Sequence, residues 1–279
     1  KGKIALAALD PSTQLLGYDL QGDKAQSWCR IYNDSVNEFV QKYPERFTAM
    51  AAVPIQEPAR AAKGLEYAVN KLGFRGAYIA THVNHRYYDS EDFDPFWAKA
   101  EELDALVFMH PDNPAGTDLM GSFGLRLVCG NPADTTLSLG LLIYSGVFDR
   151  FPNLKLCTCH GGGFFPYHVS RFDPEFVTGQ QAIRRAGRPN MPKCASAPSA
   201  YLKNLYFDTL VYDVETLDFL RGKVGADHLL LGTDFPYILG DWQCVEKVQA
   251  LNCPATEKHA ILAGNARKLL KISARSNGG

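Results

Sequence analysis

Short runs of apolar residues alternate along the chain with amphipathic stretches, and this alternation predicts a series of βαβ units. The apolar runs are rich in Val, Ile, Leu, Phe and Ala and contain few polar positions. This is typical of strands that are buried on both faces in a parallel sheet. The predicted strands cover residues 3–9, 47–53, 76–80, 106–110, 154–159, 204–209 and 228–232.

Helical patterns fill most of the intervals between these strands. Residues 58–72 begin with a proline and are followed by Gly73, which is the usual punctuation of a helix. The other predicted helices are 94–103, 132–144, 214–221 and 242–251, with a C-terminal helical pair at 254–262 and 265–270. Residues 178–200 hold prolines, basic residues and small residues, and we expect a long loop there, with a short helix as the alternative.

These elements predict an α/β fold of the (β/α)8 TIM barrel class, with residues 1–279 forming a single domain that ends in helices at about 254–270. Only seven strands are predicted, whereas a closed barrel needs eight. We therefore expect the first barrel strand to be absent from the sequence and to precede Lys1 in the natural protein. The sheet should then be open between residues 3–9 and 228–232. An open doubly wound sheet is the alternative.

Composition excludes several classes of protein. Hydrophobic residues make up 46% and charged residues 21% of the chain, and the formal net charge is −1. These values are ordinary for a globular protein and do not favour binding to nucleic acid or to an anionic membrane. No apolar run approaches the roughly 20 residues that span a bilayer.

The seven cysteines are scattered and do not show the spacing of a zinc knuckle. Cys157 and Cys159 lie in a predicted strand, and we interpret them as small buried hydrophobic residues. Free thiols of this kind indicate a reducing, cytoplasmic environment.

Unusual polar residues follow three of the predicted strands: His110, His160 and Asp234. In a parallel barrel the carboxyl ends of all strands surround one mouth, so we expect these side chains to converge. Imidazole and carboxylate groups together suit Zn²⁺, Mn²⁺ or Fe²⁺. The pattern therefore predicts a metal or acid–base site, with structural histidines as the alternative for each position taken alone.

Three glycines follow His160, and we expect them to let a substrate or metal-bound water approach the imidazole. An ordinary turn is the alternative. His82 and His85 follow another predicted strand and are candidates for lining the pocket. We assign His82 as a substrate-binding candidate, with a solvated surface histidine as the alternative.

Several segments resemble one known family. They are 33–34, 43–47, 52–56, 72–76, 109–111, 146–155, 160–163 and 232–236. Together they are similar to the aminocarboxymuconate-semialdehyde decarboxylase family of the amidohydrolase superfamily, and the similarity extends from about Lys1 to Leu270.

The resemblance implies a barrel with one divalent metal ion, zinc by preference and manganese as the alternative, and a homodimer. It implies that His110 and Asp234 bind the metal and that His160 and Asp234 are catalytic. The implied reaction is the non-oxidative decarboxylation of a small aromatic or unsaturated carboxylic acid by a carbon–carbon lyase. A hydrolase or hydratase that uses metal-bound hydroxide is the alternative, and a barrel that only binds its ligand is a third hypothesis.

Two features depart from the family pattern. The His-x-His pair of the family's first strand has no counterpart here, so we expect two further metal ligands on the segment that precedes Lys1. The second departure is in the loop 123–129, where Arg126 is a candidate partner for a substrate carboxylate. A surface arginine is the alternative.

Overall fold

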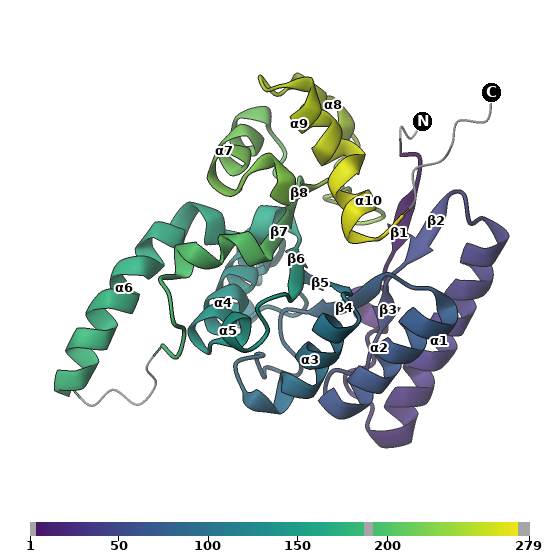
Figure 1. Cartoon of the computed structure of the whole chain (residues 1–279), viewed down its shortest axis with the longest axis horizontal. Helices are drawn as coiled ribbons and strands as arrows, with labels where there is room; N and C mark the ends of the chain where they lie inside the picture. Colours follow the sequence, from purple (N-terminus) through teal and green to yellow (C-terminus); the bar gives the residue numbers. More distant parts are fainter. Residues whose placement is uncertain (1–3, 187–191, 273–279) are drawn as a thin grey trace.

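The computed structural model describes residues 4–186 and 192–272 (Figure 1). The strands lie in the centre of the molecule and the helices lie around them. The strands are β1 (Ala7–Leu9), β2 (Phe47–Ala49), β3 (Ala51–Ala52), β4 (Gly76–Ala80), β5 (Leu106–His110), β6 (Lys155–Thr158), β7 (Leu205–Asp208) and β8 (Leu229–Leu230).

The helices connect successive strands, as expected for βαβ units. They are α1 (Gly22–Lys42), α2 (Pro58–Leu72), α3 (Asp94–Glu102), α4 (Asn131–Tyr144), α5 (Val147–Arg150), α6 (Phe165–Ala186), α7 (Val214–Val224), α8 (Cys244–Ala250), α9 (Ala255–His259) and α10 (Asn265–Leu269). Short 3-10 or π segments lie between them, among them η4 (Arg126–Gly130), η5 (His160–Gly162) and η6 (Pro198–Asn204). No helix in the described ranges is both long and apolar enough to cross a membrane.

All pairs of neighbouring strands are parallel, and the strands follow one another in chain order. Every strand lies within one of the predicted ranges. Only Met50 separates β2 from β3, so these two form the one strand predicted at 47–53. The α/β prediction is therefore confirmed.

The sheet is open at the predicted place. Within the described residues, β1 pairs only with β2 and β8 only with β7. The loops that follow the two edge strands nevertheless touch: Ser12 Oγ and Tyr237 Oη share a hydrogen bond of 3.1 Å. The carboxyl end of the sheet is thus bridged by side chains where the backbone ladder is interrupted.

Three helices differ from the prediction: α1, α5 and α6, with no helix predicted at 147–150. Helix α1 was not predicted because its buried face, Ala25, Cys29, Asn33 and Val40, is small and partly polar. Helix α6 continues to Ala186, across the start of the predicted loop at 178–200, even though it contains Pro174. Residues 187–191 of that loop lie outside the described residues, and its end forms η6.

A buried amide attaches α1 to the sheet. The Asn33 side chain donates to the carbonyl oxygen of Ala52 and accepts from its N–H, both at 2.9 Å, and only 2% of Asn33 is exposed. Because α1 has few large apolar residues, this pair of hydrogen bonds fixes where the helix lies against β3.

We expect Asn33→Ala to lower the free energy of unfolding by about 2–4 kcal/mol, because it leaves two buried backbone groups unpaired. Urea unfolding followed by circular dichroism measures this change. Asn37→Ala, on the same helix and not fully buried, is the matched control and should change the value by less than about 0.5 kcal/mol. Equal effects of the two substitutions would contradict the role of Asn33.

Candidate active site

Polar side chains gather where the central strands end. His110 is the last residue of β5, Cys159 and His160 directly follow β6, and Asp208 is the last residue of β7. Asp234 lies on the loop that follows β8. Since parallel strands all end on the same side of the sheet, residues from four distant parts of the chain meet at one mouth.

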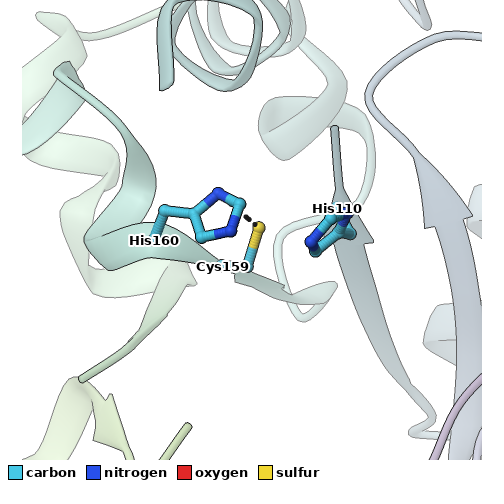
Figure 2. A group of neighbouring side chains, drawn as sticks. All are labelled: His110, Cys159 and His160. Carbon is cyan, nitrogen blue, oxygen red and sulfur yellow. Dashed lines mark hydrogen bonds between the residues drawn. The ribbon is translucent and has the colours of Figure 1, made fainter. Parts of the chain in front are cut away.

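The three predicted side chains converge as expected. His110 Nε2 lies 3.4 Å from Asp234 Oδ1, and His160 Nε2 lies 3.7 Å from Asp234 Oδ2. The two imidazole rings meet edge to face with centroids 4.9 Å apart. Figure 2 shows the two rings facing each other across the mouth, with the Cys159 sulfur between them.

Asp234 carries the negative charge of the site. Burial raises the pKa of its carboxyl group, but the contacts with His110 and His160 outweigh burial and lower the pKa to about 2. Asp234 is therefore a carboxylate at neutral pH, which makes it a ligand or a hydrogen-bond acceptor rather than a proton donor.

The hydrogen bonds of His110 leave one of its ring nitrogens available. Nδ1 lies 2.9 Å from the carbonyl oxygen of Pro111, which can only accept, so Nδ1 carries a proton. Nε2 is buried and has no hydrogen-bond partner in the described structure. In the neutral ring, with its one proton on Nδ1, this nitrogen is an unprotonated acceptor that faces a carboxylate oxygen; only with a second proton, on Nε2, does the His110 ring favour the ionised form of Asp234.

Two acceptors at this distance repel each other unless a cation or a proton lies between them. Ligands that bind one Zn²⁺ tetrahedrally at about 2.1 Å lie about 3.4 Å apart, which agrees with the observed separation of His110 Nε2 and Asp234 Oδ1. A histidine that binds a metal through one ring nitrogen usually donates a hydrogen bond from the other, and His110 Nδ1 does this to the carbonyl oxygen of Pro111. The residues present thus fit a divalent metal ion.

Two tyrosines hold the His110 ring in place. Tyr78 and Tyr237 stack on it with centroid distances of 6.0 and 5.9 Å and interplanar angles of 21° and 19°. Tyr237 is in turn hydrogen-bonded to Ser12. The sequence did not indicate these contacts, because neither tyrosine belongs to a polar motif.

Contrary to expectation, the three glycines after His160 do not leave open space for a substrate, because they pack directly against other parts of the protein. A Cβ on Gly161 would lie 2.5 Å from Val211 Cγ1, on Gly162 2.5 Å from the Phe207 ring, and on Gly163 2.1 Å from the carbonyl oxygen of Pro132. All three have positive φ. They are required because protein, rather than ligand, occupies the space where side chains would be.

The Asp208 side chain stabilises the same turn through hydrogen bonds to backbone N–H groups. Asp208 is buried, and its carboxylate accepts hydrogen bonds from the N–H groups of Gly161 at 2.9 Å and Leu210 at 3.1 Å. Burial raises the pKa of Asp208, and the nearby His160 and the backbone donors partly oppose this rise. Asp208 was not among the predicted site residues, although its place at the end of β7 is the same sequence feature that identified His110.

Cys159 is buried, as predicted, but it also belongs to the site. Its Sγ lies 3.2 Å from His160 Nδ1. His110, Cys159 and His160 each offer one atom that could bind a metal ion, and these three atoms lie within 4.8 Å of one another. A C-x-C pattern in an apolar strand does not reveal this contact, which depends on how the chain turns at His160.

His82 lies in a separate buried network. Its Nδ1 accepts from the backbone N–H of His85 at 3.3 Å, and its Nε2 lies 3.1 Å from the carbonyl oxygen of Asn113. Asp134 lies 3.9 Å away and accepts from the hydroxyl groups of Thr81 and Tyr87. Both ring nitrogens of His82 are therefore engaged, and the residue is 4% exposed, so it is not the solvated surface histidine of the alternative.

Arg126 is the first residue of η4 and is exposed. It forms no ion pair with any residue of the described ranges. None of the hydrogen bonds and ion pairs recorded for His110, His160 and Asp234 in the described structure involves Arg126.

The chain matches the family model described as Amidohydrolase over residues 6–272. It is 32% identical over 276 residues to a 2-amino-3-carboxymuconate-6-semialdehyde decarboxylase from Dictyostelium discoideum, covering 96% of this chain and 73% of the relative. A 2-keto-4-carboxy-3-hexenedioate hydratase from Sphingobium is 26% identical, covering 88% of this chain and 72% of the relative.

The fold also matches a solved structure that contains a metal. It is the dihydroxybenzoic acid decarboxylase from Polaromonas with bound manganese and the inhibitor 2-nitroresorcinol. The TM-score is 0.83, the identity is 27%, and the match covers 98% of this chain and 83% of the other.

We expect His110→Gln to reduce the metal content of the protein at least ~10-fold after dialysis, because it removes a candidate ligand whose Nε2 has no other partner in the described structure. Elemental analysis by mass spectrometry measures this loss. His168→Gln, which replaces an exposed histidine, is the control and should keep the wild-type content. A metal content that is unchanged in His110→Gln would place the ion elsewhere.

Proposed function

This chain is a member of the amidohydrolase family, and we propose that it is a metal-dependent non-oxidative decarboxylase of a small aromatic or unsaturated carboxylic acid. The supporting observation is the unpartnered Nε2 of His110 facing the Asp234 carboxylate, with His160 on the other oxygen. This arrangement provides a place for a cation and, beside it, a group that carries a proton.

His110 and Asp234 are the residues that would hold the metal. When bound, a divalent ion supplies a Lewis acid for an oxygen of the substrate. We propose zinc as the ion and manganese as the alternative, since both accept imidazole and carboxylate ligands. Catalytic zinc sites usually have three or more protein ligands, so we propose at least one ligand in addition to these two.

His160 is the proposed proton carrier. Asp234 is ionised at neutral pH because its pKa is about 2, so it orients the imidazole and does not donate. In its imidazolium form, His160 gives the Nε2 proton to the substrate carbon that bears the carboxylate, and the ring is left as a neutral imidazole with its proton on Nδ1. The bond from this carbon to the carboxylate then breaks, its electron pair returns to the unsaturated system, and CO₂ leaves.

The buried network around His82 has a proposed indirect role. Because both nitrogens of His82 are engaged, it would hold the Asn113 segment in place rather than bind the substrate itself. Arg126, exposed and without an ion pair in the described part of the chain, remains the proposed contact for an anionic group.

The test is CO₂ release from a panel of hydroxybenzoic and dienoic acids by the metal-loaded protein. We expect His160→Gln to lower kcat by ~10²–10⁴-fold while the metal content stays at the wild-type level, because the substitution removes only the proton donor. His168→Gln should retain full activity. No CO₂ from any acid of the panel, or full activity in His160→Gln, would reject the proposal.

A hydratase is the second candidate, because one relative of this chain carries that activity. In that reaction water adds to the substrate, and a divalent ion held by His110 and Asp234 would supply the Lewis acid that activates the water. Reaction in ¹⁸O-labelled water distinguishes the two, since a hydratase product contains the label at carbon and a decarboxylation product does not. We further propose a cytoplasmic location, since the seven cysteines are all free thiols.

A homodimer is the proposed assembly. Exposed apolar side chains lie on the segment that precedes α4, on α4 itself and near the start of α6, namely Leu119, Phe123, Leu137, Phe164 and Tyr167. The hydrogen bond from the Phe164 N–H to Thr136 Oγ1 places Phe164 beside α4. Leu139 and Leu142 of α4 are buried in the chain's own core, so the rest of this surface, rather than those leucines, is available to a partner.

Light scattering should give a mass of about twice 30.8 kDa at micromolar concentration. Phe123→Asp should shift the mass toward that of one chain, because Phe123 is 96% exposed and is the most exposed apolar side chain of the proposed contact. Ile31→Asp, on α1 and away from α4 (Figure 1), is the control. A monomeric wild-type protein would contradict the dimer.

A further inference from the structure

The loop that carries Asp234 closes back on its own start. The N–H of Asp241 donates to the carbonyl oxygen of Thr233 at 2.8 Å, so the loop ends beside the residue that precedes Asp234. Within the loop, the N–H of Tyr237 donates to the carbonyl oxygen of Asp234 at 2.9 Å. The backbone conformation of Asp234 therefore depends on how the Asp241 end of the loop is held.

The two sides of this loop pack closely at Gly240. A Cβ at this position would lie 3.0 Å from the carbonyl oxygen of Tyr237 and 3.1 Å from those of Thr233 and Asp234. The backbone is thus packed against itself with no room for a side chain. A displacement of the neighbouring Asp241 would be transmitted directly to the backbone around Asp234.

A buried ion pair attaches the end of the loop to α8. Lys247 Nζ donates to Asp241 Oδ2 at 2.6 Å, and the N–H of Gln243 donates to Asp241 Oδ1 at 2.9 Å. The side chains of Asp241 and Lys247 are 3% and 16% exposed, whereas those of the Arg150–Asp94 pair are each 28% exposed. Both oxygens of the Asp241 carboxylate are therefore engaged away from water.

Stability alone is a poor explanation for an ion pair buried in this way. Removing both charges from water is costly, and an apolar pair of similar shape often stabilises a fold equally well. An ion pair with further hydrogen bonds differs from an apolar pair because it satisfies its groups in only one arrangement. Its place at the end of the Asp234 loop favours a role in fixing one loop conformation.

We propose that Asp241 and Lys247 are positioning residues, whose ion pair fixes the loop 233–241 so that the Asp234 carboxylate stays between His110 and His160. Without this pair, the end of the loop would no longer be attached to α8, and the loop would open toward water. That Asp234 holds a metal rests on the proposed function, whereas the anchoring of the loop does not.

The first experiment is hydrogen–deuterium exchange of the metal-free protein, measured by mass spectrometry on peptides that cover residues 233–243. We expect the double variant Asp241→Asn/Lys247→Met to exchange at least ~10-fold faster than the wild type in this loop, with exchange in β4 and β5 unchanged. The double variant leaves no buried charge unpaired, so its urea unfolding midpoint should stay near that of the wild type.

Arg150→Met is the matched control. It breaks the partly buried pair of Arg150 with Asp94, which lies outside the loop. It should therefore lower the free energy of unfolding and leave exchange in 233–243 at the wild-type rate. A loosened Asp234 loop in this control would show that exchange there follows overall stability, and would overturn the proposal.

Two further results would overturn it. One is unchanged exchange of 233–243 in the double variant, and the other is faster exchange of this loop together with β4 and β5. The wild type is informative even if the double variant does not fold, because the N–H groups of Tyr237, Gly240 and Asp241 should all be protected. A wild-type loop that exchanges like an unstructured peptide would contradict a fixed conformation.

Metal affinity connects the loop to the site. Titration of the metal-free protein with Zn²⁺ against a chromophoric chelator should give a Kd at least ~10-fold larger in the double variant than in the wild type or Arg150→Met. Equal Kd values in the wild type and the double variant would overturn the positioning of Asp234. A wild type that binds no Zn²⁺ but shows the expected exchange would reject the proposed metal site and leave the anchored loop standing.

Discussion

The Asp234 carboxylate, held between the imidazoles of His110 and His160, is the interaction on which the site depends. A buried carboxylate is costly unless hydrogen bonds or a cation compensate for its lost hydration. Here each oxygen faces one histidine nitrogen, at 3.4 and 3.7 Å, and the pKa of the carboxyl group falls to about 2 in spite of burial. The charge of Asp234 is thus preserved, and it is placed where a metal ion or a developing positive charge would be stabilised.

The surrounding structure keeps these groups in place at a cost in backbone conformation. His160 and Asp234 both have positive φ, with values of 54° and 52°, a region that non-glycine residues rarely adopt. The turn at His160 is held by the Asp208 carboxylate and by glycines packed against Val211, Phe207 and Pro132. The loop of Asp234 is held by Tyr237, which stacks on His110 and bonds to Ser12 across the open edge of the sheet.

The sequence was most informative where one physical signal dominates. Strands buried on both faces appear as apolar runs, so all of them were located, and the polar residues that end β5, β6 and β8 identified His110, His160 and Asp234. Helix α1 was missed because Asn33 holds it by hydrogen bonds instead of a large apolar face. Cys159, Tyr237 and Asp208 were missed because their contacts arise from turns and packing between distant segments, which no local pattern encodes.

The most direct test of the account is decarboxylation in deuterium oxide. If His160 is the proton carrier of a decarboxylase, the metal-loaded protein releases CO₂ from its substrate, and the product carries one deuterium on the carbon that bore the carboxylate. His160→Gln should lose both the CO₂ and the deuterium while it keeps the metal. A product that contains oxygen from the solvent and retains its carboxylate, or deuterium incorporation at the wild-type rate in His160→Gln, would contradict the assignment of His160 as the proton carrier of a decarboxylase.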